Sequence, residues 1–380
     1  MKKQGTPGFV GERLRLACEI RNISFTSLAD ILEVSKQLIS QYMNGEKTPG
    51  SDTFTKIAEK LNFPKKFFLE ELPESNFNTV FFRSMSYTIK GQRISSRSKY
   101  LKFKEIYYFI SQYIESQIVN MPIFDIKNIY SLTDDDIEKV AVETRNYWSL
   151  KLGPLSHVIR LLENKGAIIT GFEMDASGLD AFSEWDSLSQ RPFIVLNFDE
   201  VKKTARIRFS AVHELGHIIL HRNVDPNDLN NKAKFKIIEN QSMKFASAFL
   251  LPKESFEKEA KWFELDYFVE LKKRWCVSIQ AIIMRCHHLG LITDRQFENL
   301  YINIGKRGWR KEEPLDNYFE PEYPTFIYKS IELLLQELFN RDDIIHEVSL
   351  CHKDFEEIAC LPKNFMKETE IIDFNLQIKK

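Results

Sequence analysis

The chain has 380 residues, 43% of them hydrophobic, and a formal net charge of −1 at pH 7, and this length allows two or three domains. Its five cysteines include no C-x-x-C pair, which favours free thiols in a reducing compartment. The basic start MKKQGTPGFVGERL has no apolar core behind it, which excludes a signal peptide, and no uncharged apolar run approaches the roughly 18 residues that span a membrane. We therefore expect a cytoplasmic protein with no membrane partner.

The first seventy residues contain short blocks of apolar residues at helical spacing, which predict a compact all-α bundle. Ser24, Ser35 and Ser51 stand where helix N-caps are expected. The stretch SLADILEVSKQLISQYMNGEKTP resembles the second and third helices, and the following loop, of the XRE (lambda repressor-like) helix-turn-helix. The resemblance implies binding to double-stranded DNA, with the third helix in the major groove and five residues near its exposed N-terminal half: Ser35, Lys36, Gln37, Ser40 and Gln41.

Two positions depart from the helix-turn-helix pattern. Glu33 occupies the turn position where glycine is common, and Phe25 replaces the polar residue that often opens helix two. Residues 1–70 carry eleven basic and eight acidic side chains, which is a weak positive footprint for a DNA-binding surface. Dimerisation or protein recognition by the same bundle is the alternative function, and a homodimer is among the expected partners.

A basic segment follows the bundle. Residues 78–104, NTVFFRSMSYTIKGQRISSRSKYLKFK, contain seven basic side chains and no acid: Arg83, Lys90, Arg93, Arg97, Lys99, Lys102 and Lys104. Such a run, interleaved with Phe and Tyr, could lie along phosphates or stack on exposed bases. A solvated linker is the alternative, and we favour it.

Three short stretches between residues 166 and 199 have strand character. GAIITGFEM, LDAFSEWD and RPFIVLNFD are rich in β-branched and aromatic residues and are separated by polar or turn residues. They predict a small β-sheet in front of the next helix.

The stretch RIRFSAVHELGHIILHRN, residues 206–223, concentrates histidines in an apolar helical pattern. His213 and His217 are four residues apart and therefore share a helix face, with Glu214 about 100° around the axis. Two such imidazoles can bind one Zn²⁺ at roughly 2.0–2.1 Å, and the carboxylate can take a proton from water. His221 lies roughly 12 Å along the helix from His213, too far for the same ion, and is expected at the helix end.

A third protein ligand is expected because catalytic zinc usually has three. Glu239, in the helical stretch KIIENQSMKFASAFLLP, is the better candidate, and Glu254, beyond Pro252, is expected to start the next surface helix. The two stretches resemble the ImmA/IrrE zinc metallopeptidases, whose pattern is H-E-L-G-H, then E-x-x-A-N-x-F-A and L-L-x-P. The resemblance implies that His213, His217 and Glu239 bind zinc and that Glu214 is the general base. Ser242 and Met243 replace the usual Ala-Asn.

The resemblance also covers the predicted sheet. In zinc peptidases an outer strand can hold an extended substrate by main-chain hydrogen bonds, and residues 179–185 are the candidate. An ordinary edge strand is the alternative, which we weigh equally.

Other histidines are assigned no metal. His287 and His288 are adjacent, so they point about 100° apart on a helix, and we expect a helix cap or surface role. His346, Cys351 and His352 lack tight ligand spacing.

Together these patterns predict an α+β, predominantly helical protein. The expected ranges are a helix-turn-helix bundle at 1–72, a basic linker and helical connector at 73–148, a zincin-like peptidase domain with a small β-sheet at 149–300, and a helical lobe of unknown role at 301–380. The predicted function is a zinc endopeptidase that cleaves a repressor or antitoxin and so derepresses stress, mobile-element or defence genes. The alternative is a DNA-binding regulator or antitoxin-like protein whose peptidase fold is a sensor with little or no proteolysis.

Overall fold

The computed structural model describes residues 5–72, 90–174, 179–198, 203–225 and 227–367. The structure is predominantly helical with one three-stranded sheet, so the predicted α+β class is confirmed. Contacts divide the chain into two units: Met1–Pro73, Ser98–Ile114 and Ile327–Lys380 form unit 1, and Glu74–Arg97 and Glu115–Phe326 form unit 2. The ranges 73–148 and 301–380 are therefore each divided between the units.

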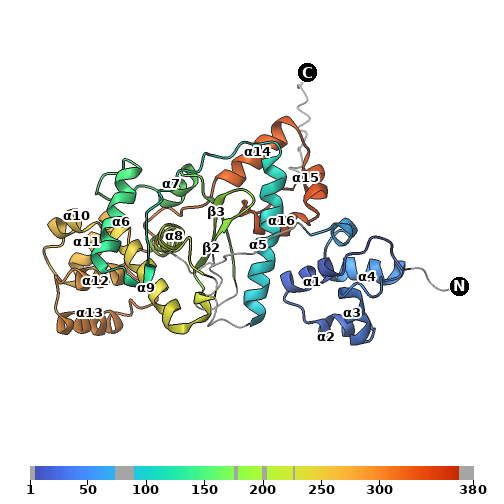
Figure 1. Cartoon of the computed structure of the whole chain (residues 1–380), viewed down its shortest axis with the longest axis horizontal. Helices are drawn as coiled ribbons and strands as arrows, with labels where there is room; N and C mark the ends of the chain where they lie inside the picture. The colour runs from blue at the N-terminus through green and yellow to red at the C-terminus, as the bar shows by residue number, and fades with distance from the viewer. Residues whose placement is uncertain (1–4, 73–89, 175–178, 199–202, 226, 368–380) are drawn as a thin grey trace, which may run out of the picture. The chain divides into compact units, whose positions relative to one another are not determined.

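Unit 1 contains the N-terminal bundle (Figure 1). Ser24 accepts a hydrogen bond from the Ser27 amide at 3.0 Å, and Ser35 accepts one from the Leu38 amide at 3.2 Å, so both predicted N-caps are confirmed. Ser51 is instead the first helical residue, behind the N-cap Gly50. The bundle comprises α1 (Gly11–Ile20), α2 (Phe25–Ile31), α3 (Lys36–Met43), α4 (Ser51–Leu61) and the 3-10 helix η1 (Lys65–Leu69).

Later segments of the chain complete unit 1. Arg13 of α1 is 2% exposed, and its Nη1 lies 2.7 Å from Oε1 of Glu105. Arg21 Nη1 donates to Asp354 Oδ1 at 2.8 Å, which joins the end of α1 to a helix more than 300 residues away. The helices that contribute are α5 (Lys90–Ser111), α14 (Phe326–Glu337), α15 (Arg341–Val348) and α16 (His352–Ile358).

The basic segment 78–104 contains the start of α5 rather than a linker throughout. Lys99 Nζ lies 2.5 Å from Glu357 Oε1, and Lys102, 1% exposed, lies 2.6 Å from Glu105 Oε2. Lys104 is buried as well. For Lys99, Lys102 and Lys104, neither contact with nucleic acid nor a solvated linker is therefore correct. Lys99 and Lys102 pair with carboxylates of unit 1, and Lys102 and Lys104 are buried within it. Arg83 and the side chains of Lys90 and Arg93 lie outside the described residues.

Unit 2 contains the sheet, and the three predicted strands are confirmed. They are β1 (Ile168–Phe172), β2 (Ala181–Asp186) and β3 (Arg191–Asn197), in the order β1-β3-β2. β1 pairs parallel with β3, Ile168 opposite Phe193, and β2 pairs antiparallel with β3, Ala181 opposite Leu196. β2 is thus an outer strand of the three that the described residues form.

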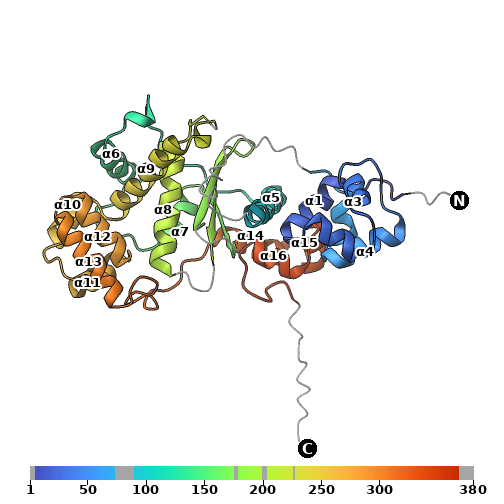
Figure 2. The same cartoon turned by 90° about the horizontal axis from the view of Figure 1, so that it is seen from below.

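At the centre of unit 2, α8 (Thr204–Leu220) packs against β2 and β3, and α9 (Lys232–Leu250) packs against α8 (Figure 2). Their shared core includes Leu215 and Phe245, both fully buried. A Cβ on Gly216 would lie 2.6 Å from Ser242 Oγ and 3.2 Å from Ser242 Cα, so glycine permits the close approach of the two helices. The remaining elements are η3 (Ile129–Ser131), α6 (Asp134–Tyr147), α7 (Val158–Asn164), η4 (Asp228–Asn230), α10 (Lys253–Glu259), α11 (Leu265–Trp275), α12 (Ile279–His288) and α13 (Asp294–Lys306).

In the part of the chain that the structure describes, no helix is long and apolar enough to cross a membrane.

Candidate metal centre

Helix α8 brings two imidazoles together as the four-residue spacing predicts. Nε2 of His213 and Nε2 of His217 are 3.1 Å apart, and the rings meet edge to face with centroids 4.7 Å apart. His217 is buried and His213 is partly exposed, so the pair lies at the boundary between core and surface. Ligand atoms of His213, Glu214 and His217 all lie within 4.8 Å of one another.

Helix α9 supplies a carboxylate to the same point. Oε2 of Glu239 lies 3.4 Å from His213 Nε2, and Oε1 lies 3.3 Å from His217 Nε2. Ser242, one turn further along α9, donates a hydrogen bond to the backbone oxygen of His213 and so ties the two helices at this level. The departure from the family pattern at Ser242 therefore contributes a contact between α8 and α9.

The three side chains fit a zinc ion. Bond lengths of roughly 2.0–2.1 Å in a tetrahedral site place neighbouring ligand atoms about 3.3 Å apart. The observed separations of 3.1, 3.3 and 3.4 Å agree with that spacing. Two nitrogens and one carboxylate oxygen are also a donor set of catalytic zinc sites, which leave the fourth position open. Glu239 and Glu254 are the two carboxylates considered as the third ligand, and Glu239 is the one whose oxygens face both imidazoles.

Glu214 has different surroundings. It is 2% exposed, and its Oε2 accepts a hydrogen bond from Ser183 Oγ of β2 at 2.6 Å. Burial raises the pKa of the Glu214 carboxyl, although the two imidazoles and the Ser183 hydroxyl oppose this effect. A carboxylate whose pKa is raised accepts a proton more readily near neutral pH, as a general base must.

Glu239 and His213 favour each other's charged forms. Burial favours the protonated carboxyl, but the interactions with the His213 and His217 imidazoles outweigh it and hold the pKa of Glu239 far below its usual range. For His213, burial lowers the pKa, while the hydrogen bond to Glu239 and the charges of Glu214 and Glu239 raise it above its ordinary value. Glu239 is therefore ionised and ready to act as a ligand.

A second layer of polar residues lies behind His217. His221 is the C-cap of α8, as its predicted helix-end position requires, but its ring is fully buried. Its Nδ1 lies 3.1 Å from Nδ1 of His217, and its Nε2 lies 3.0 Å from Oε1 of Gln241. Burial lowers the pKa of His221 to about 3, so its ring is neutral.

Sequence reasoning missed the contacts of Ser183, His221 and Gln241. The spacing of four between His217 and His221 is itself a signal that the two rings are neighbours on one face. No such signal exists for Ser183 or Gln241, because their positions depend on how β2 and α9 pack against α8.

The competing metal candidates are placed elsewhere. Glu254 lies in the first turn of α10 and pairs with Lys258 at 3.0 Å, so the predicted surface helix is confirmed. His287 and His288 end α12, where His287 Nε2 lies 2.8 Å from Asp294 Oδ1, in agreement with a helix-end role. Among the described residues, His346, Cys351 and His352 form no group of converging ligands.

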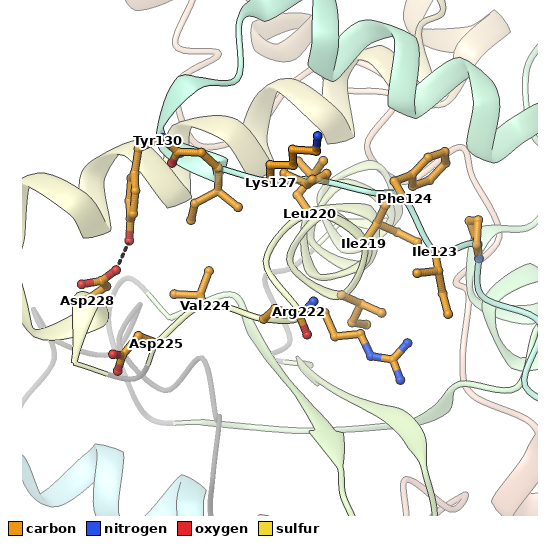
Figure 3. Close-up of a pocket in the computed structure, with 16 residues that line it drawn as sticks. Ile123, Phe124, Lys127, Tyr130, Ile219, Leu220, Arg222, Val224, Asp225 and Asp228 are labelled. Carbon is orange, nitrogen blue, oxygen red and sulfur yellow. Dashed lines mark hydrogen bonds between the residues drawn. The ribbon is translucent and has the colours of Figure 1, made fainter.

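A cavity of about 320 Å³ opens at the C-terminal end of α8 (Figure 3). Apolar side chains of the segment 122–130 and the end of α8 share its walls with charged ones, among them Lys127 and Asp225, and Tyr130 donates to Asp228 at 2.6 Å along one side. Arg222 lines the cavity, with its guanidinium carbon 3.5 Å from the ring centroid of Trp185 on β2. The cavity wall also includes Ile129, whose carbonyl accepts from Gln241 Nε2 at 2.6 Å.

In unit 1, helix α3 presents the predicted DNA contacts to solvent. Its buried side consists of Ile39, Tyr42 and Met43. Glu33, before α3, has φ 56°, which is the left-handed turn conformation that favours glycine. Ser35, Lys36, Gln37 and Ser40 are exposed and Gln41 is half-buried, so all five predicted side chains reach the surface.

Comparison with known families agrees with this geometry. Residues 162–287, which include His213, Glu214, His217 and Glu239, match the IrrE N-terminal-like domain, a peptidase family. Residues 11–70 match a helix-turn-helix domain. The chain is thus a helix-turn-helix domain fused to an IrrE-like peptidase domain, which is the ImmA/IrrE arrangement with a helix-turn-helix, and the predicted resemblance is confirmed. A search of curated proteins finds no match.

Proposed function

We propose that the chain is a zinc-dependent endopeptidase with its own DNA-binding domain, and that it cleaves a transcriptional repressor or antitoxin so that silenced stress, mobile-element or defence genes are expressed. The observation that supports this proposal most is the meeting of three ligand atoms, 3.1–3.4 Å apart, beside a buried carboxylate that is not one of them.

His213, His217 and Glu239 would hold the zinc ion. Bound there, zinc supplies a Lewis acid that lowers the pKa of water and polarises the scissile carbonyl. The side chains of α8 and α9 contribute fixed positions, because Ser242 ties the helices together and Gly216 permits their approach.

Glu214 acts as the general base in this proposal. It accepts the proton of the attacking water at a carboxylate oxygen and passes that proton to the leaving amine, which balances the hydrolysis of one peptide bond by one water. The Ser183 hydroxyl, 2.6 Å from Oε2, holds the carboxylate in one orientation.

Strand β2 is the proposed track for an extended substrate. It is the outer strand of the described sheet next to α8, and Ser183 in its middle contacts Glu214. A peptide aligned with β2 would therefore pass the general base. This role supports cleavage of a protein segment in extended form.

The helix-turn-helix would bring this activity to DNA-bound targets. The exposed residues of α3 would contact double-stranded DNA, and a repressor or antitoxin is the kind of protein that occupies the same DNA. The domain pair supports a double-stranded DNA partner and a protein substrate.

The test compares new protein N-termini in cells that express the wild type or Glu214→Gln. Glutamine keeps the volume of the side chain but cannot accept the proton, so we expect new N-termini in a repressor or antitoxin to fall by about 100-fold or more. Terminal labelling of the whole proteome followed by mass spectrometry measures them, and zinc content is measured on the purified variant.

Glu254→Gln is the matched control, because it makes the same change at an exposed carboxylate of α10. It should leave the new N-termini unchanged. Equal cleavage with Glu214→Gln and wild type, at equal zinc content, would refute proteolysis and favour the regulator in which the peptidase fold is a sensor.

A further inference from the structure

The polar residues behind His217 form a continuous chain of hydrogen bonds that ends on a backbone carbonyl. His217 Nδ1 lies 3.1 Å from His221 Nδ1, His221 Nε2 lies 3.0 Å from Gln241 Oε1, and Gln241 Nε2 lies 2.6 Å from the oxygen of Ile129. His217, His221 and Gln241 are each at most 4% exposed. At such burial each polar atom needs a partner inside the protein.

The Ile129 carbonyl at the end of this series of hydrogen bonds determines which atom donates in each of them. A backbone carbonyl only accepts, so Gln241 must present its NH2 group to Ile129 and its oxygen to His221. His221 then donates from Nε2 to that oxygen, which makes its Nδ1 the acceptor. The acceptor at Nδ1 of His221 requires an N–H at Nδ1 of His217. The remaining ring nitrogen of His217, Nε2, is left with a lone pair that faces His213 and Glu239.

The Ile129 carbonyl, at the end of this series of hydrogen bonds, is itself held in place. Ile129 begins the short helix η3, whose N-cap Asn128 accepts from the Tyr130 amide at 3.0 Å. Its side chain packs against a small cluster of buried residues made by Val224, Leu229 and Ile238. The carbonyl that sets the direction of the chain is therefore anchored by packing that is separate from the metal centre.

We propose that His221 and Gln241 are positioning residues that hold His217 in the one neutral form able to bind a metal through Nε2. This inference rests on the proposed zinc site. Residues that orient a ligating histidine typically change metal affinity by about 10- to 100-fold when they are removed. Ile129, which also lines the cavity at the end of α8, would in this way support the proposed zinc site.

The first experiment measures the zinc dissociation constant of the full chain by competition with a chelator. Gln241→Leu removes the acceptor for His221 and should weaken zinc binding by about 10- to 100-fold. Gln241→Glu keeps an acceptor for His221 but places an oxygen against the Ile129 carbonyl, so it disturbs the fold at least as much. We expect zinc affinity near the wild-type value for Gln241→Glu, because the N–H of His217 still has its acceptor.

Thr144→Val is the matched control, since it removes a buried hydrogen bond to the Val140 carbonyl within α6 without touching the ligands or the hydrogen bonds behind His217. It should keep wild-type affinity. Equal weakening by Thr144→Val and Gln241→Leu, or by both Gln241 variants, would show that only helix packing matters and would overturn the inference.

The second experiment does not depend on zinc. In the zinc-free full chain with labelled histidine, nitrogen NMR at about pH 8.5, where ordinary imidazoles are neutral, reports which ring nitrogen of His217 carries the proton. We expect Nδ1 in the wild type and in Gln241→Glu, and a mixture in Gln241→Leu. A wild-type proton on Nε2 would overturn the inference. If the wild type binds no zinc while its His217 carries the proton on Nδ1, the proposed function fails and the positioning chain stands.

Discussion

Helices α8 and α3 carry the two sets of candidate functional residues, and they hold their polar side chains in opposite ways. On α8, His217 is 1% exposed and contacts His213, His221 and Glu239. On α3, Lys36 and Gln37 are exposed and project from a helix whose buried side is entirely Ile39, Tyr42 and Met43.

Because the polar groups of α8 are buried and those of α3 are exposed, the structure of the chain alone says more about the function of α8. Buried polar groups must find partners within the protein, so their arrangement records what they are built to hold. Exposed side chains are satisfied by water, and their arrangement becomes informative only when the partner is present. The metal centre can therefore be argued from distances, whereas the DNA contacts rest on exposure and on the helix-turn-helix match.

We expect the largest change in zinc affinity from a substitution on α8. His217→Ala removes a proposed zinc ligand, so it should lower zinc affinity by more than the roughly 100-fold typical of a supporting residue. DNA binding by the same protein should be unchanged. His287→Ala is the control, because it removes a histidine that faces Asp294 on α12. Metal analysis and a chelator titration measure the effect, and full zinc in His217→Ala would refute the ligand assignment.

A double substitution on α3 should instead change DNA affinity and leave zinc binding intact. Lys36→Glu with Gln41→Ala should remove binding to a site selected from random double-stranded DNA, since each contact is worth about 1–3 kcal/mol. Zinc affinity should stay at the wild-type value. Lys60→Glu on α4 makes the same charge change off the recognition helix and should have a smaller effect. Fluorescence anisotropy over a range of salt measures binding, and unchanged affinity in the double variant would exclude α3 as the DNA reader.

The third effect concerns close packing at α8. Gly216→Ala places a Cβ 2.6 Å from Ser242 Oγ, so α9 must shift, and we expect a loss of about 1–3 kcal/mol in the free energy of unfolding. Because Glu239 moves with α9, zinc affinity should fall as well. Gly153→Ala is the control, since a Cβ there meets no atom within 4 Å. Denaturant unfolding followed by tryptophan fluorescence measures the change, and equal stability of the two variants would contradict the close approach.

The smallest effect is a gain beside α3. Glu33 has φ 56°, and a side chain in this conformation costs roughly 1–2 kcal/mol that glycine avoids. Glycine loses about 0.5–1 kcal/mol of chain entropy in return, so Glu33→Gly should stabilise α2 and α3 by at most about 1.5 kcal/mol. Hydrogen exchange of the amides in these helices measures it. Glu33→Gln, which keeps the Cβ, should not stabilise them, and an equal gain from both variants would assign the effect to charge instead.

Much of the metal centre could be predicted from the sequence, because helical periodicity fixes the relation between His213, Glu214 and His217. The third ligand needed the family resemblance to choose Glu239, since the approach of α9 is a tertiary contact. The roles of His221, Gln241 and Ser183 depend on hydrogen bonds between separate elements, and no local spacing encodes the last two.

The basic segment shows where composition misleads. Lys102 and Lys99 look solvated in a run without acids, but Glu105 comes three residues after Lys102, and Glu357 lies far away in sequence. Strand positions were predicted well because β1, β2 and β3 are short apolar runs bounded by polar residues. The N-cap at Ser51 was misplaced by one residue, since Gly50 takes the extended conformation before α4.

The contacts of Arg13 and Arg21 bear on whether the DNA-binding domain is a portable module. Residues 11–70 match a helix-turn-helix domain, yet the Arg13 and Arg21 side chains contact the carboxylates of Glu105 and Asp354. Lys66 Nζ likewise donates to the backbone oxygen of His346 at 2.9 Å. A fragment cut at residue 70, or the same domain transplanted onto another protein, would lose all three contacts together. The contacts that hold the bundle therefore come in part from segments that are distant in sequence.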